Sequence, residues 1–306
     1  MCKRSPAREE SRDVRLGRSG VSVSRIGLGT APLAGLYTPV GDEQAAATLE
    51  AAWEGGVRYF DTAPRYGDGL GERRLGRFLA GVDRSQVTVS TKVGALLDPG
   101  RRDYTVEGVY ASLSGSLERT GLDAFDILLI HDPDDHWEPA VRYAYPALDR
   151  LREQGGVRAI GVGMNQAGML ARFVRETDVD CVMVAGRYTL LDRAAGKELL
   201  PLCAERGTGV LVAGVFNGGV LADPGPGARY DYAPAAEPVL ERARELAERC
   251  AAYDVPLAAA ALQFPLRHAA VTGVVVGARS LEEVAEDLSL AATPIPDDLW
   301  TELELD

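Results

Sequence analysis

Residues 87–163 contain three short apolar segments, Val-Thr-Val-Ser-Thr at 87–91, Ile-Leu-Leu-Ile at 127–130 and Ala-Ile-Gly-Val-Gly at 159–163. Two longer segments, 106–119 and 140–153, lie between them and repeat apolar residues about every 3.6 positions, which is typical of amphipathic helices. Short strands that are apolar on both faces are typical of parallel sheets covered by helices. This stretch therefore predicts strand and helix in alternation.

The same pattern continues on both sides of this stretch. Further β-rich runs occur at 26–29, 59–62, 182–185, 210–214 and 274–277, and further helical patterns at 42–54, 71–80 and 170–176. Eight strand–helix repeats in roughly 280 residues are typical of a closed barrel rather than an open sheet. The predicted fold class is therefore α/β, a (β/α)8 TIM barrel.

Two departures from the repeat are expected to be structural additions. Residues 14–16 and 21–23 flank Arg18-Ser19-Gly20 and predict a β-hairpin that plugs the bottom of the barrel. Between the seventh and eighth strands, a loop at 223–227 precedes helical patterns at 238–253 and 257–266. This loop is interpreted either as a functional flap or as an exposed spacer. Residues 1–13 are expected to form a disordered tail, and residues 14–306 a single barrel domain.

Composition limits the classes of partner. The chain has 306 residues and a net charge of −12, which disfavours nucleic acid and anionic membranes and favours a small-molecule substrate. No run approaches the ~18 to 20 apolar residues of a membrane span, and the polar start does not resemble a signal peptide, so a cytoplasmic monomer or weak homo-oligomer is expected. The four cysteines have no metal-ligand spacing and are interpreted as reduced packing residues, with no metal site.

Four reactive side chains are expected at one rim of the barrel. The second strand leads to Asp61 and, five residues later, Tyr66; the third ends at Lys92 and the fourth at His131. Successive strands of such a barrel present their carboxyl ends together, where catalytic residues gather. Lys92 is informative because only three of the 33 basic residues are lysines.

This set of residues suits proton transfer coupled to hydride transfer at a carbonyl or alcohol carbon. A free tyrosine, with a pKa near ~10, is a poor base at neutral pH. An ammonium at Lys92 is expected to lower the pKa of Tyr66, while Asp61 keeps the lysine charged and His131 orients the substrate oxygen. A bound hydride acceptor would supply the rest of the chemistry.

These motifs strongly resemble the aldo-keto reductase superfamily. The resemblance lies in Phe60-Asp61-Thr62-Ala63-Pro64-Arg65-Tyr66-Gly67, Ser90-Thr91-Lys92, Ile130-His131 and Gly161-Val162-Gly163-Met164-Asn165. The chain is most similar to the branch of D-threo-aldose 1-dehydrogenases, which includes L-fucose and L-galactose dehydrogenases and is similar to pyridoxal 4-dehydrogenase. The resemblance implies NAD(P)-dependent oxidation of an aldose, of the L-fucose, D-arabinose or L-galactose type, at its anomeric carbon to the lactone.

The resemblance also implies a set of residues that bind the cofactor. Asn165 would hold the nicotinamide carboxamide, and the helix after the eighth strand would hold the adenosine phosphate end. Acidic residues at 283 and 287 favour NAD over NADP, because a carboxylate accepts from a ribose 2′-hydroxyl and repels a 2′-phosphate, although Arg279 would favour NADP. Ala185 and Ala213 stand where relatives have a glutamine and an aromatic, so Phe216 is expected to stack on the nicotinamide. The full set implied is Gly29, Thr30, Asp61, Asn165, Phe216, Gly277, Ala278, Arg279, Ser280, Glu283 and Asp287.

Several alternatives remain open from sequence. A pyridoxal 4-dehydrogenase or a general aldehyde or ketone reductase would use the same tetrad. The histidines and carboxylates of segment 131–136 are compatible with the metal site of an isomerase or hydrolase. Lys92 is compatible with the Schiff-base lysine of an aldolase. A subunit that senses nicotinamide cofactor without turnover is a different class. Aromatic candidates for the substrate pocket are Tyr37, Trp137 and Tyr230.

Overall fold

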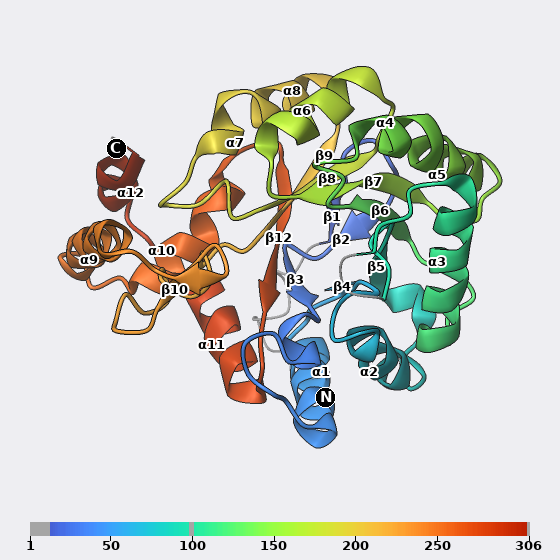
Figure 1. The fold of residues 1–306 in the computed structure, drawn as a ribbon. Coiled ribbons are helices and arrows are strands. Elements are labelled where there is room, and N and C mark those ends of the chain that lie inside the picture. Colours follow the sequence, from blue (N-terminus) through green and yellow to red (C-terminus); the bar gives the residue numbers. More distant parts are fainter. Residues whose placement is uncertain (1–12, 98–100, 305–306) are drawn as a thin grey trace, which may run out of the picture.

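Eight parallel strands close into a barrel in the computed structural model, which describes residues 13–97 and 101–304 (Figure 1). The last strand of the barrel pairs with both the strand before it and the first, which completes the ring. The predicted TIM barrel is therefore confirmed. In barrel order the strands are β3 (Ile26–Gly29), β4 (Tyr59–Asp61), β5 (Thr88–Val93), β6 (Ile127–His131), β7 (Ala159–Met164), β8 (Cys181–Ala185), β9 (Gly209–Ala213) and β12 (Val271–Gly277).

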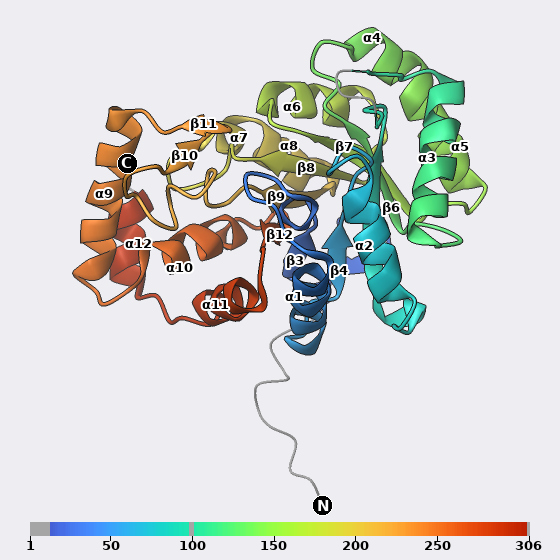
Figure 2. The same cartoon turned by 60° about the horizontal axis from the view of Figure 1, so that its bottom comes forward.

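Helices surround the barrel and alternate with its strands, as predicted (Figures 1 and 2). The α-helices are α1 (Asp42–Glu54), α2 (Leu70–Leu79), α3 (Val106–Thr120), α4 (Trp137–Pro139), α5 (Tyr145–Glu153), α6 (Ala167–Glu176), α7 (Ala194–Lys197), α8 (Leu199–Arg206), α9 (Glu237–Ala251), α10 (Leu257–Gln263), α11 (Leu281–Ala291) and α12 (Asp297–Glu304). Shorter turns are η2 (Pro32–Ala34), η3 (Arg84–Gln86), η4 (Ala140–Ala144) and η5 (Phe264–Arg267).

The helix predicted at 140–153 is not uniform. Its first part, η4, is a π-helix in which the amide of Tyr145 donates to the carbonyl of Ala140, and α-helical geometry starts only at α5. Pro146 follows directly and has no amide proton to donate to the preceding turn. The wider π turn accommodates that missing donor.

The strands have distinct inner and outer faces, because successive side chains point to opposite sides of a sheet. One buried cluster contains Tyr59, Ile127, Leu129, Met183 and Leu211 and fills the barrel interior, whereas their strand neighbours pack against the helices. Asp61 shares the inward face of β4 with Tyr59, and His131 shares that of β6 with Leu129. Polar groups at the ends of these strands therefore point into the mouth of the barrel.

The predicted hairpin closes the bottom of the barrel. Strands β1 (Val14–Arg15) and β2 (Ser22–Val23) pair antiparallel, and the adjoining Leu16 and Val21 are fully buried in the interior cluster. Gly17 lies where β9 begins, with φ +53°, and a Cβ there would come within 2.4 Å of the Gly209 nitrogen. Only glycine fits that approach. The predicted tail, residues 1–13, lies outside the described residues except for Asp13.

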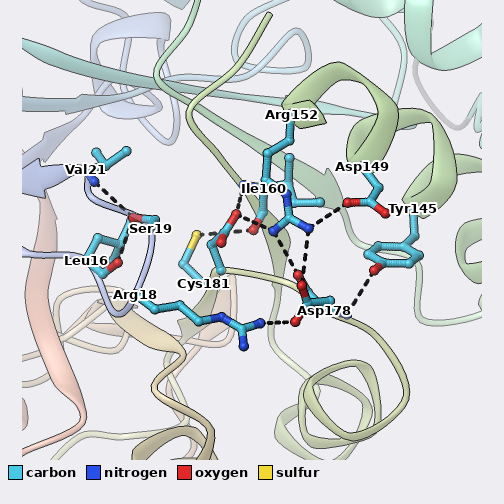
Figure 3. Close-up of polar contacts among 11 residues, drawn as sticks. Leu16, Arg18, Ser19, Val21, Tyr145, Asp149, Arg152, Ile160, Asp178 and Cys181 are labelled. Carbon is cyan, nitrogen blue, oxygen red and sulfur yellow. Dashed lines mark hydrogen bonds and ion pairs between the residues drawn. The ribbon is translucent and has the colours of Figure 1, made fainter. Parts of the chain in front are cut away.

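A polar network fastens this end of the barrel (Figure 3). Arg152 donates from Nη1 to Asp180 Oδ2 at 2.9 Å and from Nη2 to Asp149 Oδ1 at 2.6 Å. Asp180 also accepts from the backbone amide of Ile160 at 2.9 Å. Arg18 of the hairpin pairs with Asp178 in the loop before β8. The network thus joins the hairpin, α5 and the start of two strands.

The insert between β9 and β12 carries a second core. Its helices α9 and α10 lie beside the C-terminal helix α12 (Figure 2). Buried side chains such as Leu240, Leu246 and Phe264 fill the space between them. Both helices predicted in this insert are present, and the segment that precedes them forms a hairpin of β10 (Arg229–Tyr230) and β11 (Ala233–Pro234) that was not predicted. Among the described helices, none has the length and apolarity needed to cross a bilayer.

A buried carboxylate joins three elements of the barrel wall. Glu72 on α2 is fully buried and accepts from Arg119 Nε on α3 at 2.6 Å and from Thr91 Oγ1 on β5 at 2.9 Å. We expect Glu72→Ala to lower the free energy of unfolding by about 3–5 kcal/mol, because it leaves a desolvated guanidinium without its counter-ion. Denaturant unfolding followed by circular dichroism measures this. Glu118→Ala, an exposed site on α3, is the control, and equal stability of the two variants would contradict the prediction.

Candidate active site

The four predicted acid–base residues meet at the mouth of the barrel. Asp61, Lys92 and His131 come from β4, β5 and β6, and Tyr66 from the turn after β4. Lys92 Nζ donates to Asp61 Oδ2 at 2.6 Å, to the carbonyl of Thr62 at 3.0 Å and to the Tyr66 hydroxyl at 3.0 Å. All three ammonium protons are thus accounted for. Because the Tyr66 oxygen accepts from Lys92, its own proton is left for another partner.

Asp61 is held by a second contact that sequence reasoning missed. Its Oδ1 accepts from Ser90 Oγ at 2.6 Å, and Ser90 Oγ lies 2.9 Å from the buried Tyr59 hydroxyl. Ser90 lies two residues before Lys92 on β5, so both side chains face the interior. The two-residue spacing of Ser90 and Lys92 along a predicted strand could have indicated that Ser90 points toward the same site. Ser90 fixes the orientation of the carboxylate that anchors Lys92.

The titration of Tyr66 differs from the sequence prediction. Burial raises the pKa of Tyr66 to about 12, and the charge of Lys92 opposes that rise without cancelling it. Burial by itself lowers the pKa of Lys92, but the charges of Asp61 and Tyr66 raise it above its usual value. Lys92 does lower the pKa of Tyr66, as predicted, but burial has the larger effect and the net pKa lies above the ordinary value of about 10. At neutral pH the pair consists of a protonated phenol and an ammonium.

His131 is an uncharged ring beside Tyr66. Burial, followed by the positive charges of Lys92 and two arginines, holds the pKa of His131 well below its usual range. The two rings meet edge to face, with centroids 6.1 Å apart. Tyr104, another residue that sequence reasoning missed, donates from its hydroxyl to the backbone carbonyls of His131 and Asp132 at 2.7 and 2.8 Å. A neutral imidazole held in this way can donate to or accept from a substrate oxygen.

The rim beyond β7 and β9 has the features that a dinucleotide needs. The side chain of Asn165 makes no hydrogen bond with any other residue in 13–97 or 101–304 and the residue is half-buried, so its amide is available to a carboxamide. Asn217 Oδ1 is buried without a partner, and Gly218 and Gly219 beside it have φ of +79° and +111°. Phe216, expected to stack on the nicotinamide, is half-buried and packs against both helical cores. Left-handed glycines next to an orphaned amide oxygen fit a bound polar ligand.

A second part of the predicted cofactor site lies at the start of α11. Ser280 caps this helix by accepting from the amide of Glu283 at 3.3 Å, and Gly277 and Arg279 beside it are exposed. Glu283 accepts from the Arg279 backbone amide at 2.7 Å and from its guanidinium at 2.6 and 2.9 Å. Burial and neighbouring carboxylates raise the pKa of Asp287 to about 7. The helix end that is predicted to hold the phosphate end of the cofactor is thus lined by acidic groups.

Three of the implied cofactor residues are buried in the rim itself. Gly29 ends β3, and Ala278 follows β12. Thr30 is fully buried, and its hydroxyl donates to Thr62 Oγ1 at 2.8 Å. This hydroxyl therefore joins two loops of the barrel rim and is not presented to a cofactor. Of the aromatic pocket candidates, Trp137 packs against Phe173 with ring centroids 4.6 Å apart, as part of the outer core.

Fold and site together define a class: a TIM-barrel oxidoreductase with an Asp-Tyr-Lys-His tetrad that uses a nicotinamide cofactor. The aldo/keto reductase family model matches residues 25–304, and the chain belongs to that family. It is 43% identical to a D-threo-aldose 1-dehydrogenase from Pseudomonas sp over 93% of this chain and 94% of the relative. It is 40% identical to a pyridoxal 4-dehydrogenase from Microbacterium luteolum, over 94% and 95%.

A solved structure agrees with this assignment. The holo form of an aldo-keto reductase from Bacillus halodurans superposes with a TM-score of 0.80 and is 25% identical, with 96% of each chain covered. A metal-dependent isomerase or hydrolase and a Schiff-base aldolase, both open from the sequence, do not account for the family match or for a lysine whose protons are all donated.

Proposed function

We propose that this protein oxidises an aldose at its anomeric carbon and releases the lactone, with NAD as the preferred hydride acceptor. The observation that carries the proposal is the contact of the Lys92 ammonium with both Asp61 and Tyr66, which supports a role for Tyr66 in proton transfer beside an uncharged histidine. The similarity to a D-threo-aldose 1-dehydrogenase over nearly the whole chain supports this choice of substrate class.

The reaction balances as follows. The anomeric C–H bond breaks and its electron pair leaves as hydride, the O–H bond breaks and its proton goes to Tyr66, and the carbon–oxygen bond becomes the lactone carbonyl. A bound nicotinamide nucleotide supplies the hydride acceptor. Tyr66 must lose its own proton before it can accept another, and with a pKa of about 12 this base form grows as pH rises. In the reverse direction the protonated phenol is already the acid.

Asp132 supports a polyhydroxy substrate. Its carboxylate lies 3.6 Å from His131 Nε2, which is beyond hydrogen-bond distance, and it accepts no hydrogen bond within the described chain. The backbone of Asp132 has a φ of +44°, in the left-handed region that aspartate adopts more readily than most other non-glycine residues. Asp132 is positioned to accept from a sugar hydroxyl next to the reacting carbon.

Oxidation of pyridoxal is the second candidate, because the chain is 40% identical to a pyridoxal 4-dehydrogenase. The test is NADH absorbance with purified protein, NAD and a panel of L-fucose, D-arabinose, L-galactose and pyridoxal. We expect the highest kcat/KM with one of the aldoses. A preference for pyridoxal would establish the second candidate instead. Turnover of neither class, with cofactor still bound, would favour a non-catalytic sensing subunit.

The preference for NAD rests on Glu283, which binds the guanidinium of Arg279 and adds a negative charge beside the helix end. We expect Glu283→Arg to lower KM for NADP by tenfold or more, because it releases Arg279 and adds a second cation for a 2′-phosphate. Glu286→Arg, an exposed site on the same helix with the same change in net charge, is the control. A ratio of kcat/KM for the two cofactors that is unchanged in Glu283→Arg would contradict this account.

A further inference from the structure

Two exposed tyrosines from distant parts of the chain meet beside the barrel mouth. Tyr37 lies in the loop between β3 and α1, and Tyr232 in the turn between β10 and β11. Their ring centroids are 6.5 Å apart with an interplanar angle of 42°. They are 44% and 62% exposed, so the pair is not part of either buried core. Aromatic rings that remain this accessible have faces available for a ligand.

The backbone holds both rings in conformations that tyrosine disfavours. φ is +69° at Tyr37, +48° at Asp231 and +66° at Tyr232. The two-residue turn at Asp231 and Tyr232 needs positive φ at both positions, for which asparagine and glycine are the usual residues. A tyrosine here contributes nothing to the turn itself. The unfavourable backbone conformation of Tyr232 therefore indicates a function for its side chain.

Two contacts fasten the hairpin to the barrel rim. Arg187, in the loop after β8, donates to both oxygens of Asp231 at 2.9 and 2.8 Å, which is a bidentate pair. Arg229 on β10 lies over the Tyr37 ring, with its guanidinium carbon 5.0 Å from the ring centroid. The hairpin tip is thus tied to the loops after β3 and β8, both of which leave the catalytic end of the barrel.

The hairpin tip also interacts electrostatically with residues of the tetrad. Partial desolvation raises the pKa of Tyr232, with further contributions from charges that include Asp132 and Lys92. Tyr232 in turn is one of the groups that raise the pKa of Tyr66. Tyr230, the residue that sequence reasoning chose on this segment, instead packs against the core of α9, α10 and α12.

We propose that Tyr232, together with Tyr37, forms an aromatic wall of the substrate pocket that selects ring-shaped substrates by packing against their apolar face. This inference rests on the proposed function, since it assigns the residues that discriminate among its substrates. A pyranose presents C–H groups on one face and a pyridine presents its π face, and both pack well on a tyrosine ring. A short open-chain aldehyde has no such face and reaches the tetrad without the wall.

The test compares a ring substrate with an open-chain one in the same variants. L-Fucose oxidation with NAD and methylglyoxal reduction with NADH are measured for Tyr232→Ala, Tyr37→Ala and Tyr232→Phe. We expect KM for L-fucose to rise about tenfold in Tyr232→Ala and to return close to the wild-type value in Tyr232→Phe. Methylglyoxal reduction is expected to change less than about twofold, since it uses the tetrad alone.

Tyr143→Ala is the matched control, because Tyr143 is 43% exposed and lies on η4 in the outer layer with Arg142 near its ring. An unchanged KM for L-fucose in Tyr232→Ala, or equal losses with both substrates, would overturn the inference. If the wild-type enzyme oxidises pyridoxal but no aldose, the proposed aldose function fails, and the inference is judged by the KM for pyridoxal. Turnover of methylglyoxal alone would contradict both.

The hairpin anchor provides a second readout. Arg187→Met removes the bidentate contact to Asp231 without touching either tyrosine. Because Arg187 is a positioning residue, Arg187→Met is expected to raise KM for the ring substrate, as Tyr232→Ala does, and to leave kcat for methylglyoxal unchanged. An Arg187→Met enzyme with wild-type KM for L-fucose would show that the anchor does not hold the wall.

Discussion

Replacing Tyr66 by phenylalanine is expected to lower kcat for aldose oxidation by about 10² to 10⁴ and to leave NADH binding intact. The change removes only the hydroxyl, whose oxygen accepts from Lys92 at 3.0 Å. Lys92 keeps its contacts with Asp61 and with the Thr62 carbonyl, so the fold around the site is retained. Initial rates from NADH absorbance give kcat, and quenching of protein fluorescence gives the affinity for NADH.

The pH dependence separates loss of the proton-transfer group from a structural effect. In the wild type, the base form of Tyr66 is scarce below its pKa of about 12, so the oxidation rate should rise with pH through the neutral range. The residual activity of Tyr66→Phe should lose that rise. Tyr145→Phe removes a hydroxyl that contacts the Asp178 amide before β8 and serves as the control. A Tyr66→Phe enzyme with a wild-type rate would refute the assignment.

Replacing Lys92 by methionine is expected to lower the free energy of unfolding by about 3–5 kcal/mol and to reduce turnover by at least about 10². Lys92 and Asp61 are both nearly fully buried and pair at 2.6 Å. Removing the ammonium leaves a desolvated carboxylate that, among residues 13–97 and 101–304, keeps Ser90 as its side-chain donor. It also exposes Tyr66 to the charge of Asp61 with no compensating cation, which raises the pKa of Tyr66 further.

A double substitution distinguishes these two effects. Asp61→Asn combined with Lys92→Met removes both buried charges, so most of the lost stability should return while turnover remains low. Chemical denaturation gives the stability, and NADH absorbance gives the turnover. Lys197→Met, at an exposed lysine on α7, is the matched control. Recovery of activity together with stability would mean that the pair serves only the fold.

The barrel and the tetrad were predictable because each depends on a local pattern. Strand β6 is apolar on both faces and ends at His131, and β5 carries the lysine two residues after Ser90. A repeating strand–helix pattern places such strand ends at one rim whatever the details of packing. The residues that carry proton transfer therefore followed from their order along the chain and from the resemblance to a known family.

Supporting contacts were not predictable, because they depend on three-dimensional packing. Nothing local indicates that Tyr104 would reach the carbonyl of His131, or that burial would outweigh Lys92 in setting the pKa of Tyr66. On the insert, the sequence suggested Tyr230 as an aromatic candidate, whereas Tyr232 occupies the two-residue turn between β10 and β11. Tyrosine rarely adopts a positive φ, so this conformation results from tertiary packing and cannot be predicted from local backbone preference. The sequence suggested a flap or an exposed spacer at residues 223–227 but did not indicate a hairpin at 229–234 with Tyr232 exposed.

The proposed aldose oxidation requires that hydride leaves the anomeric carbon of the sugar. The most direct measurement uses L-fucose deuterated at carbon 1, with wild-type protein and NAD, followed by mass spectrometry of both products. We predict one deuterium in the reduced nicotinamide for each lactone formed, and loss of that transfer in Tyr66→Phe. Reduced cofactor without deuterium, or no reduction of the cofactor by any aldose, would contradict the account.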